Sequence, residues 1–531
     1  MPPKRTLPFS SQPPAASPPS KKPRPSPTRP KKHSRSPSPV TTLRDKAGHG
    51  EWKDWPAPQE QMETAREWIR ECVKGKHRVL LIPDKDADGL SSACLLAHTF
   101  HTLGHDPSLL QVYHLPRSAT NIHSDRARSD ILSTQFPAAN QHNDDDEGGT
   151  PTRCIVLDQG SRPGPALVPG IETLLIDHHL SDSFPSGPIT VLSACHSLPV
   201  ATTSLLVYEL SSTLVPTLRG SGPTGLAALV GAYGDLGAGK LKFGGGGDDE
   251  PWPASLAPIE KQLTKSALSK AVALLNAPRR TPEFKVADAY SALVAAAANA
   301  AAQTDGLSSK VLKGILDDDK LIEAKERTSA ETARWQAAPP VFTKDGKIAV
   351  VTIDSGYQIH PVIATRWTGT LRKAKTLVCV MTLETWGTDG LSFFEFVGGQ
   401  QCANTGYTPG FVHFSCRAPR RGTQDSSAPP VVDLIAFLRS LAPLCEQLAP
   451  GWTSRVGEDW ARGHREATGG IVKAEEFRVL MEACQVGVKK DKDEKKINGG
   501  AAKKVIDPGQ KTTLDGFFKI SPAKKVKGEK V

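Results

Sequence analysis

Residues 79–89, Val79-Leu80-Leu81-Ile82-Pro83-Asp84-Lys85-Asp86-Ala87-Asp88-Gly89, join a short apolar run directly to an acidic turn. The apolar run predicts a buried strand, because strands covered on both faces lack the alternating polar residues of half-exposed ones. The aspartates of the turn repel one another unless cations neutralise them, and their hard oxygen atoms suit magnesium or manganese. An EF-hand calcium loop would need Glu at its twelfth position, where this chain has Leu95. The turn therefore predicts a cation site of another kind.

The residues around this turn alternate between short strands and helices. Apolar segments of four or five residues, separated by helices, are typical of a parallel sheet with both faces covered. We therefore expect residues 60–250 to form an α/β domain built on a doubly wound parallel sheet. The further expected strands are Gln111–Leu115, Cys154–Leu157 and Thr173–Ile176, and the expected helices are Gln61–Val73, Leu90–Leu103, Val200–Leu210 and Thr224–Tyr233.

The second half of the chain begins with a helical pattern and then returns to strands. Residues 255–340 are rich in Ala, Leu and Lys at helical spacing and predict a helical connection. Residues 345–485 predict a second, smaller α/β domain. Its expected strands are Ile348–Ile353, Thr376–Thr382, Phe393–Val397 and Phe411–Cys416, and its expected helices are Val431–Leu441 and Ala474–Cys484.

The positive charge of the chain lies at its two ends. The 531 residues have a formal charge of +10, yet residues 1–50 contain 11 Lys and Arg against one acid, and residues 486–531 contain 13 Lys against six acids. The body between them is therefore acidic, and both tails are expected to be disordered because they have little apolar surface to bury. The basic clusters within residues 21–35 resemble a nuclear-import signal, with a solubilising arm as the alternative. We expect a nuclear protein that binds an import receptor through this segment.

Other patterns exclude several classes of protein. Acidic clusters within residues 138–151 and 244–250 are flanked by Gly, Pro or Asn and are interpreted as solvated loops, not as ligands. The nine cysteines form no Cys-x-x-Cys pair, which argues against a zinc ribbon or a redox motif and fits a reducing compartment. No apolar run approaches the about 18 residues needed to span a bilayer, so no membrane partner is expected.

Further acidic and histidine residues follow later strands of the expected sheet. Asp158 follows Cys154–Leu157, the triplet Asp177-His178-His179 follows Thr173–Ile176, and Asp235 follows the helix Thr224–Tyr233. A single carboxylate after a strand is more often a capping residue than a ligand. Because parallel strands direct their carboxyl ends to one edge, however, these positions converge and predict a site for two cations about 3.5–4 Å apart.

Together these motifs resemble those of the DHH phosphoesterase superfamily, in the family's order and over about residues 75–245. The first motif has three aspartates and no histidine before them, which favours the RecJ-like branch over the nanoRNase and pyrophosphatase branches. The resemblance implies hydrolysis of a phosphodiester with two ions, manganese or magnesium, of which manganese is the expected activator. The implied ligands are Asp84 and Asp86 for one ion, Asp88, His178 and Asp235 for the other, and Asp158 for both. His179 would contact the scissile phosphate or orient its neighbour, and Asp177 would help to hold the histidines.

The expected second domain resembles the domain that accompanies DHH domains. A Gly-rich segment around a histidine, residues 463–470, and the strand around residues 413–417 resemble the family's substrate-contacting elements. Glycine lets backbone amides approach phosphate oxygens, and an arginine binds one bidentately. Taken separately, these segments could be an ordinary turn and a surface arginine. The implied substrate contacts are Ser415, Arg417, Gly463, His464, Thr468 and Gly469.

The lysine-rich tail carries a short apolar motif at residues 511–518. It resembles the peptide that binds the sliding clamp (PCNA), in which an aliphatic residue and two aromatic residues follow a polar one and fill an apolar pocket. The corresponding residues are Lys511, Leu514, Phe517 and Phe518. Lys511 stands where the motif usually has glutamine.

The sequence therefore favours a RecJ-like exonuclease that acts on single-stranded DNA or RNA and is recruited by the sliding clamp in DNA replication or repair. One alternative is a hydrolase of short oligonucleotides, cyclic dinucleotides or other small phosphate compounds. Another is a non-catalytic replication scaffold that keeps the cation site for structure.

Overall fold

The computed structural model describes residues 54–117, 121–136, 151–239, 241–243, 251–303, 307–371, 377–385, 410–419, 432–457 and 460–488. The import segment 21–35, the expected strand Phe393–Val397, the two acidic loops for the most part and the clamp motif 511–518 lie outside these residues. Among the described helices, none combines the length and apolarity needed to cross a bilayer.

Five parallel strands form the first sheet, in the order β2-β1-β3-β4-β5. Their bounds are β1 (Val79–Pro83), β2 (Leu110–Val112), β3 (Arg153–Leu157), β4 (Glu172–Asp177) and β5 (Ile189–Ser193). The chain moves from β1 to its neighbour β2 and then returns to the other side of β1 for β3. The winding therefore reverses between β1 and β3, which is where open α/β sheets bind ligands in a crevice at the carboxyl ends of their strands.

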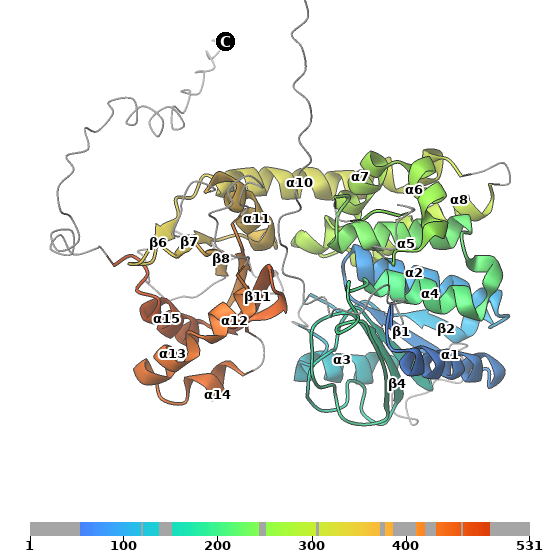
Figure 1. The fold of residues 1–531 in the computed structure, drawn as a ribbon, viewed down its shortest axis with the longest axis horizontal. Coiled ribbons are helices and arrows are strands. Elements are labelled where there is room, and N and C mark those ends of the chain that lie inside the picture. The colour runs from blue at the N-terminus through green and yellow to red at the C-terminus, as the bar shows by residue number, and fades with distance from the viewer. Residues whose placement is uncertain are drawn as a thin grey trace, which may run out of the picture. The chain divides into compact units, whose positions relative to one another are not determined.

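Both faces of this sheet are buried. In β1, Val79 and Leu81 belong to one apolar cluster, whereas Leu80 and Ile82 belong to another. The first cluster contains residues of α1 (Gln59–Lys74), α2 (Ala87–Thr102), α4 (Thr203–Leu214) and α5 (Gly222–Asp235), and the second contains residues of α3 (Asp125–Gln135). Figure 1 shows α2, α4 and α5 running together beside the strands. The expected doubly wound parallel sheet is confirmed, with β5 and α3 as additions.

Two helices of this sheet, α2 and α4, begin three residues away from their expected starts, for the same physical reason. Asp86 caps α2 by accepting the N–H groups of Asp88 and Gly89 at 3.1 and 3.3 Å, so α2 begins within the acidic turn. Thr202 caps α4 by accepting the N–H group of Leu205 at 3.4 Å, so α4 begins after the expected start. Asp88 consequently lies in the first turn of a helix and not in a loop.

The helical segment after the first sheet extends its core. Residues of α6 (Ala257–Leu263), α7 (Lys265–Leu275), α8 (Val286–Ala301), α9 (Lys313–Leu316) and the start of α10 (Asp319–Gln336) join the same apolar cluster as α5. The segment is therefore part of the structure that supports the sheet, in addition to being a connection.

The second sheet has six strands in the order β10-β11-β9-β8-β7-β6, with β7 and β8 parallel and the other pairs antiparallel. Its strands are β6 (Val341–Phe342), β7 (Ile348–Ile353), β8 (Cys379–Thr385), β9 (Phe411–Arg417), β10 (Arg462–His464) and β11 (Ala467–Lys473). Its helices are α11 (His360–Thr370), α12 (Leu434–Arg439), α13 (Ala442–Leu448), α14 (Trp452–Val456) and α15 (Ala474–Ala483). This is the second α/β unit expected from the sequence.

One expectation about the second unit is wrong in detail, and one Gly-rich segment has more regular structure than the alternative of an ordinary turn. The expected helix Val431–Leu441 ends at Arg439, and a new helix begins at Ala442 with Pro443 in its first turn. Proline is tolerated there because the N–H groups of a first turn have no acceptor within the helix, so the missing N–H group costs no hydrogen bond. The Gly-rich segment around His464 is a β-hairpin and not only a turn. Gly463 within it has a φ of +112°, which L side chains rarely adopt.

Gly231 permits the close packing of three helices. A Cβ atom on Gly231 of α5 would lie 2.3 Å from Oγ of Ser204 on α4 and 2.7 Å from Oδ1 of Asp88 on α2. We expect Gly231→Ala to lower the free energy of unfolding by about 1–3 kcal/mol through overpacking. At Gly369 of α11 a Cβ atom would meet no packed atom of the described residues within 4 Å, so Gly369→Ala should instead stabilise by up to about 1 kcal/mol. Denaturant unfolding of both variants checks this, and two stabilising substitutions would contradict the packing.

Candidate metal centre

The acidic turn is attached to the neighbouring strand at the reversal point of the sheet. The N–H group of Asp84 donates to the carbonyl of Leu157 at the end of β3 at 2.9 Å. Gly89 packs against the backbone of Asp84. A Cβ atom on Gly89 would lie 2.6 Å from the carbonyl oxygen of Asp84 and 2.8 Å from its nitrogen. The glycine that ends the motif is therefore required by the closeness of α2 to the strand.

Asp88 is buried at the N-terminus of another helix. It is 0% exposed, and its carboxylate accepts the N–H group of Thr203 at 2.8 Å and that of Ser204 at 3.0 Å. These N–H groups belong to the first turn of α4 and have no partner within that helix. The helix dipole and two hydrogen bonds thus stabilise the negative charge of Asp88.

Asp158 lies at the centre of the site in an uncommon backbone conformation. Its φ is +62°, and the residue is 3% exposed. Oδ1 accepts a hydrogen bond from Oγ1 of Thr203 at 2.9 Å and lies 3.3 Å from Nε2 of His178. Non-glycine residues in this backbone region are often found at functional sites, where the surrounding structure supports the strain.

His178 is placed among carboxylates. Its Nε2 atom lies 3.1 Å from Oδ2 of Asp235 and 3.3 Å from Oδ1 of Asp158, yet it has hydrogen-bond geometry to no atom in the described part of the chain. A buried nitrogen close to two carboxylate oxygens, without hydrogen-bond geometry to either, fits an arrangement in which all three atoms bind one metal ion.

The ligand atoms form two groups that share one residue. Asp84, Asp86 and Asp158 offer oxygen atoms that lie within 4.8 Å of one another, and so do the ligand atoms of Asp88, Asp158 and His178. Asp235 adjoins the second group through His178. The structure therefore brings together the six ligands expected from the sequence, with Asp158 common to both groups. Carboxylate oxygens and an imidazole nitrogen fit a divalent cation such as manganese or magnesium.

The electrostatics of the centre reflect several carboxylates that are buried close together. Burial raises the pKa of Asp158 well above its usual value, and neighbouring Asp88 raises it further. Burial likewise raises the pKa of Asp88 to about 6, with a further contribution from Asp235. Burial would lower the pKa of His178, but Asp235 raises it to about 9. These shifts follow from burial and from the crowding of carboxylates, which a bound divalent cation would relieve.

Asp177 is buried next to the expected ligands and holds the neighbouring histidine. It is 0% exposed, and Oδ1 accepts hydrogen bonds from the N–H group of His178 at 2.8 Å and from Nδ1 of His179 at 2.8 Å. Burial opposes the charge of Asp177, yet His179 lowers the pKa of this carboxyl below its usual range. Asp177 in turn raises the pKa of His179 to about 9 against the effect of burial. His179 is therefore oriented by Asp177, which also favours its protonated form.

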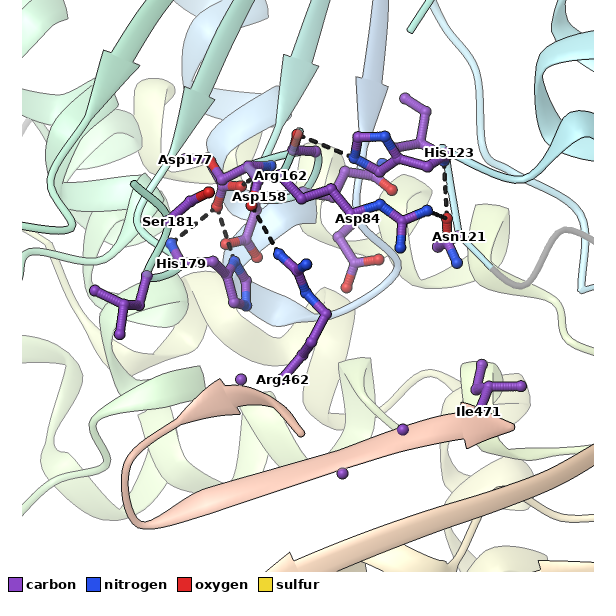
Figure 2. Close-up of a pocket in the computed structure, with 18 of the residues that line it drawn as sticks. Asp84, Asn121, His123, Asp158, Arg162, Asp177, His179, Ser181, Arg462 and Ile471 are labelled. Carbon is purple, nitrogen blue, oxygen red and sulfur yellow. Dashed lines mark hydrogen bonds and ion pairs between the residues drawn. The ribbon is translucent and has the colours of Figure 1, made fainter. Parts of the chain in front are cut away.

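A cavity of about 770 Å³ adjoins the centre and has a wall from each sheet. Figure 2 shows Asp84, Asp158, Asp177 and His179 gathered on one side, with Arg462 and Ile471 of the second sheet facing them. Of the expected substrate contacts, the residues that line the cavity are Ser415, Arg417, Gly463, Thr468 and Gly469. His464 is not among the lining residues; its ring stacks on that of His179 at a centroid distance of 5.5 Å.

The hairpin wall is fixed by its own hydrogen bonds and by one to the first sheet. Thr468 Oγ1 donates to the carbonyl of Arg462 at 2.7 Å, and the Arg462 guanidinium donates to the carbonyl of Ser161 at 2.9 Å. Ala461, next to the hairpin, has a φ of +50°, a backbone conformation that favours glycine. The hairpin thus keeps a glycine-like backbone without the glycine.

Several residues of the site were not expected from the sequence. Arg279 approaches Oδ2 of Asp86 at 3.6 Å, and Asn276 Oδ1 accepts the N–H group of Ala87 at 3.2 Å. Neither residue has a sequence signal, because both follow α7 and reach the acidic turn only through the fold. Thr203 does have one, since a Thr-Thr-Ser run before an apolar helix predicts a helix start.

Comparison with known proteins defines the fold. No protein-family model and no curated protein matches the chain in sequence. RecJ from Thermus thermophilus in complex with Mn²⁺ is similar in structure, with a TM-score of 0.50, 15% identity and coverage of 80% of this chain. This chain spans about half of that RecJ chain, 54%. The DHH domain of a member of a family of ribosomal proteins has a TM-score of 0.52 and 14% identity, with 83% of this chain and 93% of that chain covered. The chain therefore has the fold shared by RecJ and DHH-domain proteins.

Proposed function

We propose that the chain is a metal-dependent phosphodiesterase that acts as an exonuclease on single-stranded nucleic acid. The observation that carries the proposal is the pair of ligand groups that share Asp158 on one wall of a cavity, opposite a wall with an arginine and backbone glycines. The similarity to a manganese-containing RecJ supports it. The complete set of ligands favours an enzyme over a scaffold.

The proposed roles follow from the position of each group. Asp84 and Asp86 would hold one ion, Asp88, His178 and Asp235 the other, and Asp158 both. Bound there, manganese or magnesium would polarise a phosphoryl group and activate water for attack. His179 is held by Asp177 through Nδ1, so Nε2 remains as the donor toward a phosphate oxygen in the cavity.

The opposite wall is proposed to bind the nucleic-acid backbone. Arg417 lines the cavity with its guanidinium 3.3 Å from Oγ of Ser415, so the two donors can serve one phosphate. Gly469 packs so closely that a Cβ atom would lie 2.3 Å from the carbonyl of Phe414. A side chain there would separate β11 from β9, so the glycine preserves the shape of the wall. The remaining proposed contacts are Gly463, His464 and Thr468.

The nuclease assay tests the function directly. With Mn²⁺, the purified chain should release nucleotides from end-labelled single-stranded DNA or RNA, and faster from long strands than from dinucleotides. Asp158→Asn should reduce the rate at least about a hundredfold, because the residue shared by both groups loses its charge. Asn tolerates positive φ better than Ala and keeps the backbone at this position. Hydrolysis of dinucleotides or small phosphate compounds, with no cleavage of single-stranded DNA or RNA, would show that the proposed substrate is wrong.

Metal binding is testable without any substrate. In the absence of metal, Asp158→Asn should raise the unfolding midpoint at pH 8, because an acid whose folded pKa is raised destabilises the fold at pH values above its unfolded pKa. Added Mn²⁺ should raise the midpoint of the unsubstituted chain and not that of the variant. Asp317→Asn, at an exposed aspartate after α9, is the control and should behave like the unsubstituted chain. An equal Mn²⁺ response in all three proteins would rule out this centre.

We also propose recruitment to DNA replication or repair sites in the nucleus, through the import segment 21–35 and the clamp motif 511–518. The support is the sequence of the basic tails. Replacing Phe517 and Phe518 together by Ala should abolish binding to the sliding clamp and leave cleavage of free oligonucleotides unchanged, as measured by clamp pull-down and by the nuclease assay. Undiminished clamp binding would remove the motif from the proposal.

A further inference from the structure

We propose that Thr203, the first residue of α4, is the positioning residue that sets the distance between the buried carboxylates of Asp88 and Asp158. The inference rests on the proposed metal centre, to which it adds a residue outside the expected ligands. It concerns how the two ligand groups stay aligned when their charges repel one another.

Thr203 uses two different donors on two different carboxylates. Its backbone N–H group donates to Oδ2 of Asp88 at 2.8 Å, and its Oγ1 hydroxyl donates to Oδ1 of Asp158 at 2.9 Å. Asp88 belongs to α2, whereas Asp158 follows β3, so one residue connects two separate elements of the centre. Thr203 is itself 0% exposed, which keeps water from competing for either bond.

The position of Thr203 in its helix makes this pairing possible. The first N–H groups of a helix lack acceptors within it, so those of Thr203 and Ser204 are free to bind Asp88. The β-branched threonine side chain has few allowed χ1 angles, so its hydroxyl has little freedom relative to the same backbone, and the observed rotamer directs it at Asp158. A hydrogen bond to Oδ1 limits rotation of the Asp158 carboxylate, whose oxygen atoms belong to both ligand groups.

The adjacent threonine has a different task. Oγ1 of Thr202 accepts the N–H group of Leu205 at 3.4 Å and lies 2.9 Å from Oγ of Ser204, so Thr202 caps α4. Thr202 is also 0% exposed, and these hydrogen bonds of its hydroxyl remain within the first turn of α4. Thr202 therefore supports the helix, whereas Thr203 aligns the carboxylates.

The test compares Thr203→Val, Thr203→Ser and Thr202→Val in the full chain, by calorimetric titration with Mn²⁺ alone and by thermal unfolding. Thr203→Val removes the hydroxyl and keeps the backbone donor, and it should weaken Mn²⁺ binding about 10-fold or more. Thr203→Ser restores the hydroxyl and should bind within about threefold of the unsubstituted chain. Thr202→Val should lower the unfolding midpoint and leave the Mn²⁺ affinity unchanged.

Unchanged Mn²⁺ affinity in Thr203→Val, or an equal loss in Thr202→Val, would overturn the assignment while the proposed function stands. If the unsubstituted chain binds no Mn²⁺, the metal centre and the assignment fail together. Thr203→Ala, which adds no bulk, replaces the valine variant if that variant does not fold, and the same tenfold criterion applies.

Discussion

The main constraint on the structure is that carboxylates, which repel one another, are held close together at the reversal point of a parallel sheet. Asp88 and Asp158 are almost completely buried, and Asp84 and Asp86 adjoin them from the turn after β1. Repulsion of this kind persists only where the surrounding structure supplies positive charge or donors. The domain around the first sheet is arranged to do so, through the N-terminus of α4, His178 and Arg279.

These compensating groups explain why the fold around the centre is so tightly specified. Gly231 lets α5 approach Asp88 and Ser204, and Gly89 lets α2 approach the backbone of Asp84. Asp158 has a left-handed backbone conformation, and its side chain is held by a hydrogen bond from Thr203. The centre is thus maintained at a cost in stability, as is common for sites whose charge is needed for binding or catalysis.

Much of this arrangement could be predicted from the sequence, because the local signals are strong. The apolar run before Asp84 predicted β1 within one residue, and Asp84, Asp158 and His178 lie near one another because the parallel strands that they follow end at one edge. Thr203, Asn276 and Arg279 could not be assigned to the centre, since only tertiary packing brings α4 and α7 to the acidic turn. Pro443 is a different case. Proline in a first turn is a local signal for a helix start, yet the helix that begins there, α13, was not among the expected ones.

Anomalous diffraction at the manganese edge, from crystals grown with Mn²⁺, tests the central claim most directly because it locates the ions themselves. The account predicts peaks on both sides of Asp158, one beside Asp84 and Asp86 and the other beside Asp88, His178 and Asp235. A chain saturated with Mn²⁺ in solution whose anomalous peaks all lie away from Asp158 would contradict it.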